Sequence, residues 1–135
     1  MSPLKVETTP AGTTYGNPIR GPADYTRTVT IDPDTLSTDE IDAHGYVKPG
    51  TPLKEGGGLA DGTASEHIEG VVVEATKVAD SNAAADLTAA DPVDVAVLTI
   101  GQVNRAIIED NLGRTLTGNE VAAFAAAGCL LKLIE

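Results

Sequence analysis

Aromatic residues are scarce in this chain. Its 135 residues include one Phe, three Tyr and no Trp. Aromatic side chains normally supply large blocks of buried area, so the core has to be assembled from Val, Ile, Leu and Ala. We therefore expect a thin core in a single modest domain, with part of the stability drawn from partners.

Cysteine and long apolar runs are lacking as well. The single cysteine, Cys129, lies among leucines, with Lys132 as the nearest basic residue in sequence, which favours a buried inert thiol over a nucleophile. One cysteine forms no disulfide within the chain. No apolar signal core opens the sequence, and no apolar run approaches membrane-spanning length. The sequence therefore predicts a soluble protein made in a reducing compartment.

Positive charge is in short supply. Nine Lys and Arg face twenty Asp and Glu, for a net charge of −11. Residues 1–24 are neutral, because Lys5 and Arg20 balance Glu7 and Asp24, so the excess acid lies in the remainder. A nucleic acid or an anionic membrane requires a basic contact surface. We expect neither as a partner.

Motifs that carry chemistry are also missing. The sequence has no Gly-x-Ser-x-Gly elbow and no His-Glu-x-x-His. His44 and His67 have no Cys or His at metal-ligand spacing, and the Gly56-Gly57-Gly58 triplet has no strand before it or helix after it to make a phosphate loop. We predict no catalytic residue, no cofactor and no metal. An enzyme that uses clustered carboxylates stays the weaker alternative.

Aspartates near residue 32 resemble part of a calcium loop. Asp32 and Asp34 have a suitable spacing, but Leu36 stands where an oxygen ligand is needed and the turn glycine is missing. We interpret the pair as turn residues that end a strand.

The last third of the chain carries the clearest structural pattern. The run from Val93 to Val103 is apolar and β-branched, which favours a buried strand. From Asn104 to Gly113 apolar residues recur at helical spacing, and the glycine stands where a helix would stop. We predict a strand followed by a short helix.

A second helix and a final strand follow. Thr117 and Glu120 match a capping box, and Val121, Phe124 and Ala125 are predicted to share its buried face. Gly128 is placed for a C-terminal cap, and residues 129–134 form a short apolar strand.

Weaker patterns fill the middle. Apolar and polar residues alternate from Tyr25 to Ile31, which predicts a half-buried strand. Residues 46–53 are predicted to form an extended edge segment that is bent by its prolines. Gly70–Ala75 is predicted to form a second apolar strand. Ser37 and Glu40 suggest one helical turn closed by Gly45. The Ala- and Asp-rich residues 78–90 predict a mobile surface loop.

The fold class that follows is mixed α/β and mainly β. We predict a globular domain over residues 25–135, with two short helices near its C-terminal end. The predicted core comprises Val71, Val73, Val95, Val97, Ile107, Val121, Phe124 and Leu131.

Residues 1–24 are predicted to form an extended N-terminal arm. Half of the eight prolines lie here, and the apolar residues follow neither a strand nor a helix period. Such an arm is either disordered or becomes ordered on a partner, and the residues leave both possibilities open. Leu4, Val6, Tyr15 and Ile19 are the candidate anchors.

Several short sequence segments resemble those of the lambda-type head decoration proteins of tailed bacteriophages. They are residues 45–53 (GYVKPGTPL), residues 69–73 (EGVVV), residues 93–98 (VDVAVL) through Val103-Asn104-Arg105, and the Ala-rich helix that runs into residues 128–132 (GCLLK). The likeness covers about residues 25–135 and is one of pattern and order.

The resemblance implies a small twisted sheet or barrel of the β-clip or β-tulip kind. It also implies a structural virion protein, made in the host cytoplasm, that sits on the outer capsid surface as a homotrimer near three-fold positions. Such a protein binds the major capsid protein after the shell expands and holds neighbouring subunits against DNA pressure. Another small virion protein, from the tail or a fibre, is the main alternative.

Under the resemblance to decoration proteins, we expect the arm to be the capsid-binding element. Its apolar anchors would dock on the shell while the backbone around Thr8 to Thr14 adds a strand to a capsid sheet.

Overall fold

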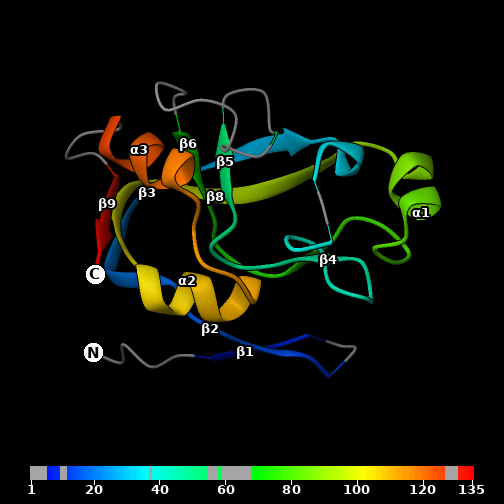
Figure 1. The fold of residues 1–135 in the computed structure, drawn as a ribbon, viewed down its shortest axis with the longest axis horizontal. Helices are drawn as coiled ribbons and strands as arrows, with labels where there is room; N and C mark the ends of the chain where they lie inside the picture. The colour runs from blue at the N-terminus through cyan, green and yellow to red at the C-terminus, as the bar shows by residue number, and fades with distance from the viewer. Residues whose placement is uncertain (1–5, 10–11, 37, 55–57, 59–67, 127–130) are drawn as a thin grey trace.

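Two long antiparallel strands, β3 (Ile19–Ile31) and β8 (Val93–Asn104), form the centre of the fold. They belong to a computed structural model that describes residues 6–9, 12–36, 38–54, 58, 68–126 and 131–135. The remaining elements are short: β1 (Val6–Thr8), β2 (Thr14–Gly16), the 3-10 helix η1 (Pro33–Thr35), β4 (Tyr46–Val47), β5 (Pro52–Lys54), β6 (Ile68–Val72), β7 (Thr76–Lys77), α1 (Ala84–Ala89), α2 (Arg105–Leu112), α3 (Gly118–Ala126) and β9 (Leu131–Ile134). Figure 1 shows their arrangement.

The main sheet has the strand order β3-β8-β6-β5, with β9 as a further partner of β8. β3 runs antiparallel along one side of β8. On the other side, β6 pairs antiparallel with Val97 and Leu98, and β9 pairs in parallel with residues 101–104. The predicted mainly β fold with two short helices near the C-terminal end is therefore confirmed, as is the edge position of β5.

The core lies on both faces of this sheet. Neighbouring residues of a strand point to opposite faces, and here Val71 and Val72 are both buried, as are Val97 and Leu98 opposite them. Val72 and Val97 belong to a cluster covered by α1, η1 and β4, while Val71 and Leu98 belong to a second cluster covered by α2 and α3. Two buried layers thus sandwich the β6–β8 pair.

Most of the predicted core residues are buried. Val71, Val95, Val97, Phe124 and Leu131 are almost fully inaccessible, and Val73 and Val121 are partly buried against the second cluster. The core position predicted for Ile107 is wrong, because this residue is only half-buried and lies in neither core cluster. Ile108 beside it takes the core position on α2, while Ile107 faces Gly16 of β2.

Helix α2 has both of its expected ends, and α3 has its expected start. Asn104 caps α2 by accepting from the backbone N–H groups of Ala106 and Ile107, and Gly113 ends it in the left-handed conformation at φ 73°. At α3 the Glu120 N–H donates to Thr117 Oγ1 at 3.1 Å, and the Thr117 N–H donates to Glu120 Oε1 at 2.9 Å. This reciprocal pair is the predicted capping box.

The buried face of α3 differs from the prediction at one residue. Ala123 is fully buried, whereas Ala125 is exposed. The buried face of α3 therefore includes the alanine before Phe124 and not the alanine after it. Because alanines stand on both sides of Phe124, the sequence pattern did not show which of them is buried.

The strand predicted from Tyr25 begins earlier, at Ile19. The boundary expected between residues 24 and 25 therefore falls inside β3. The register against β8 shifts between Arg20 and Tyr25 and again at Thr26, so the strand is irregular there. That irregularity hides the two-residue period that marks a strand in sequence.

The surface loop predicted over residues 78–90 contains helix α1 instead. Val78, Ala79 and Leu87 are buried in the first cluster. The start of the helix is stabilised by Ser81, whose Oγ accepts from the Ala83 N–H and donates to Asp86 Oδ2 at 2.6 Å. One buried leucine among alanines and aspartates is too weak a periodic signal to predict a six-residue helix.

Turn predictions near residue 32 are confirmed, because the Asp32 carboxylate accepts from the Asp34 N–H and caps η1. The helical turn predicted from Ser37 and Glu40 is not formed in the described residues 38–45, which contain turns and an isolated bridge at Ile41. Gly45 has φ 84°, a conformation that favours glycine, and ends the turn before β4. Other predicted features lie outside the described residues: Ser37, the glycine loop apart from Gly58, His67, Gly128 and Cys129.

Phe124→Ala should destabilise the fold by roughly 3–5 kcal/mol, because the ring is 3% exposed and its removal leaves a cavity in the second cluster. Urea denaturation measures this. Ala125→Ser, on the exposed side of the same helix, is the matched control and should change stability by less than about 0.5 kcal/mol. Equal midpoints for the two variants would contradict the orientation of α3.

Candidate functional site: the N-terminal hairpin and its dock

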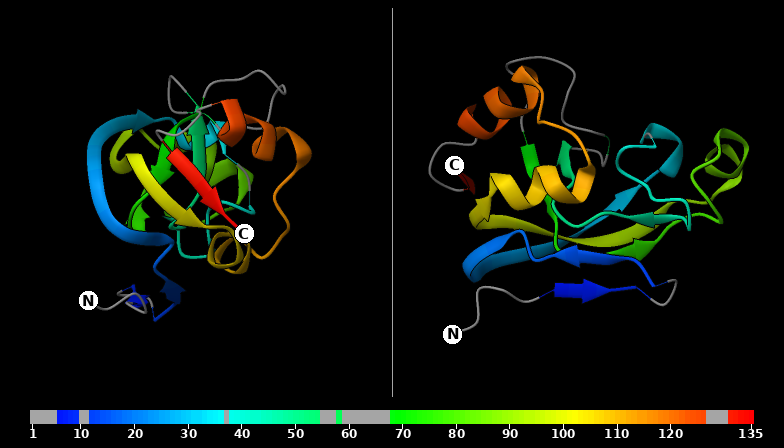
Figure 2. Two further views of the ribbon diagram at one scale, coloured as in Figure 1. Left: turned by 90° about the vertical axis from the view of Figure 1, so that its left-hand side faces the viewer. Right: turned by 60° about the horizontal axis from the view of Figure 1, so that its bottom comes forward.

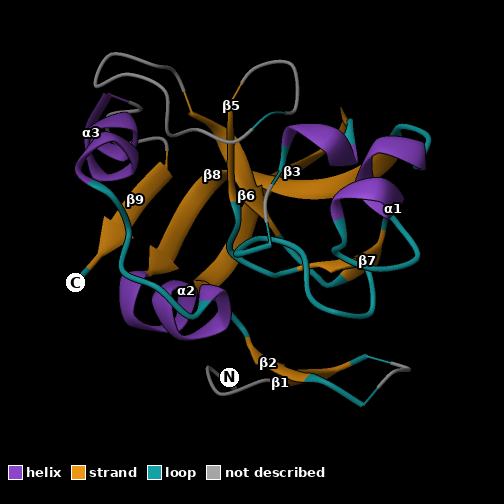
Figure 3. Cartoon of the chain, turned by 45° about the vertical axis from the view of Figure 1, so that its right-hand side comes forward, coloured by secondary structure: helices purple, strands orange, loops and turns teal. Residues whose placement is uncertain are grey.

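The N-terminal segment forms a β-hairpin that lies against α2. Val6, Glu7 and Thr8 of β1 pair antiparallel with Gly16, Tyr15 and Thr14 of β2. Figure 3 shows the hairpin as a separate layer below α2. Its turn is closed by hydrogen bonds between Thr9 and Thr13, including Thr13 N–H to Thr9 Oγ1 at 3.3 Å. The backbone from Thr8 to Thr14, expected to extend along a partner, turns back on itself.

One strand of the hairpin faces the body and the other faces away. β2 contacts α2, whereas β1 pairs with β2 and with no other described strand. The outer edge of a strand presents backbone N–H and C=O groups that a further strand can bind. Within the described chain, β1 is therefore an open edge held at a distance from the main sheet.

Tyr15 anchors the hairpin to the loop before β4. Its ring is 5% exposed, and its hydroxyl donates to Asp42 Oδ2 at 2.6 Å. The other oxygen of Asp42 accepts from the backbone N–H groups of His44 and Tyr46 at 2.9 and 3.0 Å. Because three donors hold this carboxylate, Tyr15 binds a fixed acceptor.

Asn111 binds the hairpin backbone from α2. Its Oδ1 accepts from the Gly16 N–H at 3.0 Å, and its Nδ2 donates to the Gly16 carbonyl at 2.8 Å and to the Pro49 carbonyl at 3.1 Å. The buried amide thus pairs with Gly16 as a neighbouring strand would. It also joins the hairpin to the segment between β4 and β5.

Glycine at position 16 lets β2 approach α2 closely. A Cβ added there would meet Ile107 Cγ2 at 3.0 Å and Asn111 Oδ1 at 3.8 Å. A larger residue would push the strand away from the amide that binds it. We call the residues of the body that hold the hairpin, namely Asp42, Ile107 and Asn111, the dock. The half-buried Ile107 therefore belongs to the dock rather than to the main core.

A charged cluster stabilises the body beside the dock. Arg114 donates to Glu120 at 2.7 and 2.9 Å and to Glu40 at 2.8 Å, and lies 3.6 Å from Asp39. The carboxylates of Glu40 and Glu120 are buried, and their hydrogen bonds, those of Glu120 first, raise the pKa of Arg114. The cluster joins the start of α3 to the loop that carries Asp42.

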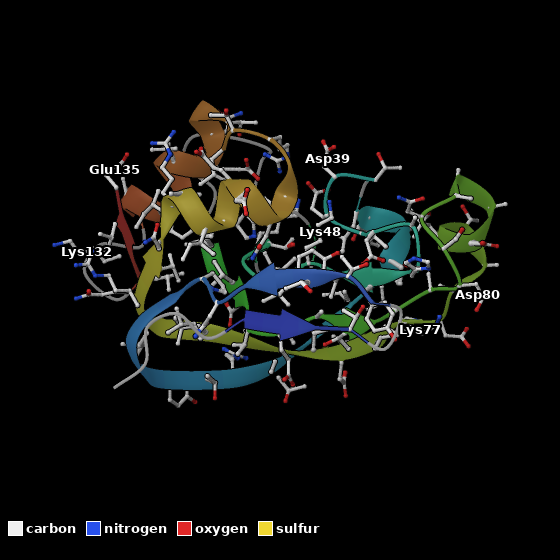
Figure 4. The ribbon with its side chains drawn as sticks, turned by 90° about the horizontal axis from the view of Figure 1, so that it is seen from below. Asp39, Lys48, Lys77, Asp80, Lys132 and Glu135 are labelled. Carbon is white, nitrogen blue, oxygen red and sulfur yellow. The ribbon has the colours of Figure 1, made fainter. Side chains whose placement is uncertain are left out.

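Lys48 lies on the same side of the molecule, as Figure 4 shows together with Asp39. Its ammonium donates to the Leu112 carbonyl at the C-terminal end of α2 at 3.3 Å. Burial lowers the pKa of this amine, while the nearby carboxylates of Asp39 and Asp42 act in the opposite direction. A cation at a helix C-terminus is a structural contact, so we assign Lys48 to the dock's support.

Glu109 connects α2 to the linker before α3. Its Oε2 accepts from the Leu116 N–H at 2.8 Å and from Arg105 Nε at 3.0 Å. The hydrogen bond from Leu116 is the first cause that lowers the pKa of Glu109 below its ordinary value, and Arg105 adds to it. The charged form of Glu109 is therefore the one that stabilises this connection.

The four predicted anchors are placed differently from one another. Leu4 lies outside the described residues, and Val6 belongs to β1. Tyr15 is buried in the dock, and Ile19 packs against the second core cluster. Because both of these side chains already contact the body of the same chain, the edge of β1 is the better candidate for contact with a partner.

Asn111 and Asp42 were missed as functional residues. Asn111 shares the buried side of α2 with Ile108 and Leu112, three positions before it and one after it. A polar residue on an apolar helix face is a signal, because it needs a buried partner. Nothing in the sequence indicated that the partner was Gly16, which is 95 residues away.

Neither a metal site nor a membrane-spanning helix is found among the described residues. No group of three or more His, Cys, Asp or Glu side chains in that part of the chain is placed to hold a metal ion. None of the described helices has the length and apolar character needed to cross a membrane. Comparison with known proteins adds nothing further: no family model, no curated protein and no solved structure matches this chain.

Asn111→Leu should release the hairpin while the body stays folded. The substitution keeps the size of the side chain but removes three hydrogen bonds, each with a net contribution of about 1 kcal/mol. The Gly16 amide should exchange with deuterium at least about tenfold faster. Asn82→Leu is the matched control, since it removes an amide contact to the Ile41 carbonyl and no hydrogen bond to the hairpin itself. Protection of Gly16 that is the same in both variants would contradict the dock.

Glu109→Gln should make stability less dependent on acid pH. The folded pKa lies below the ordinary value of 4.5, so the stabilisation is present above that value and lost as pH falls through the folded pKa. The variant should be less stable than the natural chain at about pH 7, and the difference should shrink as the pH falls below 4.5, as measured by urea denaturation. Asp110→Asn, on the exposed side of α2, controls for the loss of one negative charge. A difference that does not change with pH would contradict the assignment.

Proposed function

We propose that this chain is a capsid decoration protein of the lambda-type kind. It binds the outer surface of an expanded phage head, contacts the major capsid protein and holds neighbouring subunits together against internal DNA pressure. The function is structural, with no catalytic step. The proposal includes the finer fold class, a β-clip or β-tulip, and a homotrimer near three-fold positions, both of which rest on the resemblance of residues 25–135.

The observation that carries the proposal is the open outer edge of β1. The hairpin is fixed to the body through β2, by Tyr15, Gly16 and Asn111, which leaves β1 on the far side. A fixed edge strand binds an extended segment by strand addition, with backbone hydrogen bonds that do not depend on the partner's side chains. Because the edge is ordered beforehand, less entropy is lost on binding.

Charge on the hairpin supports a protein partner. Residues 6–16 contain one charged residue, Glu7, whereas the whole chain carries a net charge of −11. The candidate contact is thus nearly neutral on an otherwise acidic molecule. A neutral edge can approach a protein surface without the repulsion that the acidic body would meet on a surface of like charge.

Three residues of β1 form few hydrogen bonds, so one hairpin binds weakly. The proposed trimer offers three hairpins to one site. Once the first is bound, the others are held at high local concentration, and the assembly binds far more tightly than a single strand. This is how a short edge would secure a protein against the pressure inside a head.

Deletion of residues 1–12 should abolish binding to heads. The variant loses β1 but keeps Tyr15 and Gly16, so the body should stay folded with an unchanged melting curve. Cosedimentation with expanded, DNA-free heads, assembled from the major capsid protein of the same genome, measures the binding. The full chain should saturate the lattice, and the variant should remain in the supernatant.

Deletion of residues 1–5 is the matched control. It shortens the chain and leaves β1 in place, so the shorter variant should still bind. Binding of the 1–12 deletion at the level of the full chain would overturn the proposed contact. Failure of the full chain to sediment with heads would overturn the function itself.

A further inference from the structure

The outer edge of β3 is a second open edge. β3 stands at the end of the strand order and pairs with β8 alone among the described strands. The left view of Figure 2 shows it along the border of the molecule, on the side away from α2 and α3. From Thr26 to Ile31 its register with β8 is unbroken. Regular backbone over six residues presents a continuous row of N–H and C=O groups.

Devices that normally protect an edge are confined to the first half of the strand. Both register shifts lie between Arg20 and Thr26, and the one proline of the strand is Pro22. The second half reads Tyr-Thr-Arg-Thr-Val-Thr-Ile over residues 25–31, with five β-branched residues. From Thr26 on, this edge is β-branched, has no proline and pairs regularly with β8, so it is suited to pairing with another strand.

Charge makes this edge unusual for the molecule. Residues 25–31 contain no acidic residue, and their one base, Arg27, forms an ion pair with Glu69. Two copies of a chain with a net charge of −11 repel each other over most of their surfaces. A contact between copies therefore favours this uncharged strip.

One aromatic ring is exposed beside the strip. Tyr25 is 53% exposed and is the large apolar side chain left exposed among the described residues. Thr28 and Thr30 are exposed on the opposite face of the strand, next to Ala96 and Asp94 of β8. The side chains of Tyr25 on one face and of Thr28 and Thr30 on the other are thus open to a neighbour, whereas Val29 and Ile31 are buried in the first core cluster.

We propose that β3 pairs antiparallel with β3 of a second copy, across a two-fold axis at Thr28. This register places Tyr25 opposite the partner's Ile31, Thr26 opposite the partner's Thr30 and Arg27 opposite the partner's Val29. Thr26 and Thr30 are exposed, and threonine with threonine is a favourable cross-strand pair. The side chains of Val29 and Ile31 are buried in their own chain, so these residues pair through their backbone groups. The result is one continuous sheet with an isologous interface.

A register shifted by one residue is less favourable. With the axis at Arg27, two arginines would face each other, and like charges directly opposite destabilise a sheet. With the axis at Val29, the pairing would reach Asp32 and Pro33, and Pro33 already belongs to η1. The axis at Thr28 uses all seven residues from 25 to 31.

This contact is separate from the shell contact proposed for β1. A trimer with three β3 edges would use it to join one trimer to the next, and a monomer would use it to form a dimer. Thr28→Lys places a charge at the axis and should block the pairing. The same variant should still bind to heads, so failure of one proposal leaves the other standing.

A disulfide at the axis tests the register. In a background with Cys129→Ser, Thr28→Cys should form a disulfide between copies under mild oxidation, because directly opposite Cα atoms lie about 4.5–5.5 Å apart. Ala96→Cys is the matched control, since it is exposed on the same face one strand inward and its copies would lie about 14 Å apart, three strand spacings. Non-reducing gels over a hundredfold range of protein concentration give the yields.

The expected result is at least about tenfold faster cross-linking of Thr28→Cys than of Ala96→Cys. Sedimentation velocity should show that Thr28→Lys reduces the mass of the assembly formed by the natural chain to that of the unit that carries the edge, a monomer or a trimer. Equal cross-linking of the two cysteine variants would overturn the proposal, as would a mass that Thr28→Lys leaves unchanged.

Discussion

Burial of both faces of the β6–β8 pair is the constraint on which this structure depends. Val71 and Val72 are consecutive, as are Val97 and Leu98, and all four are buried. A strand with two apolar faces needs cover on each side. The first cluster recruits α1 and η1, and the second recruits α2 and α3. With so few aromatic residues, small aliphatic side chains in two thin layers replace one thick core.

The hairpin is attached in a different way, by polar contacts rather than by apolar area. A tyrosine hydroxyl, an asparagine amide and a glycine backbone hold β2 in place. Hydrogen bonds are directional, so they define the position of a strand while contributing modestly to stability. A part held this way is ordered and can still separate from the body without unfolding it. That combination suits a segment whose outer edge binds a partner.

Charge divides the surface into regions with different uses. The cluster around Arg114 neutralises buried acids beside the dock, so the body keeps its shape despite the excess of carboxylates. The strand β1 and the second half of β3 carry little charge, and each is an open edge within the described residues. We propose the first as the contact to a shell protein and the second as the contact to another copy of the chain.

Local signals in the sequence determined β8, α2 and α3. A β-branched run, the Asn104 and Gly113 caps and the Thr117–Glu120 box act within a few residues, so one stretch of chain contains the whole cause. Helix α1, the early start of β3 and the docking of the hairpin were decided by tertiary structure. Helix α1 forms because Leu87 is buried in the first core cluster, and Asn111 hydrogen-bonds to Gly16, which is 95 residues away in the sequence. Such long-range contacts produce no local pattern in the sequence, because they stabilise the chain only when the fold has brought both residues together.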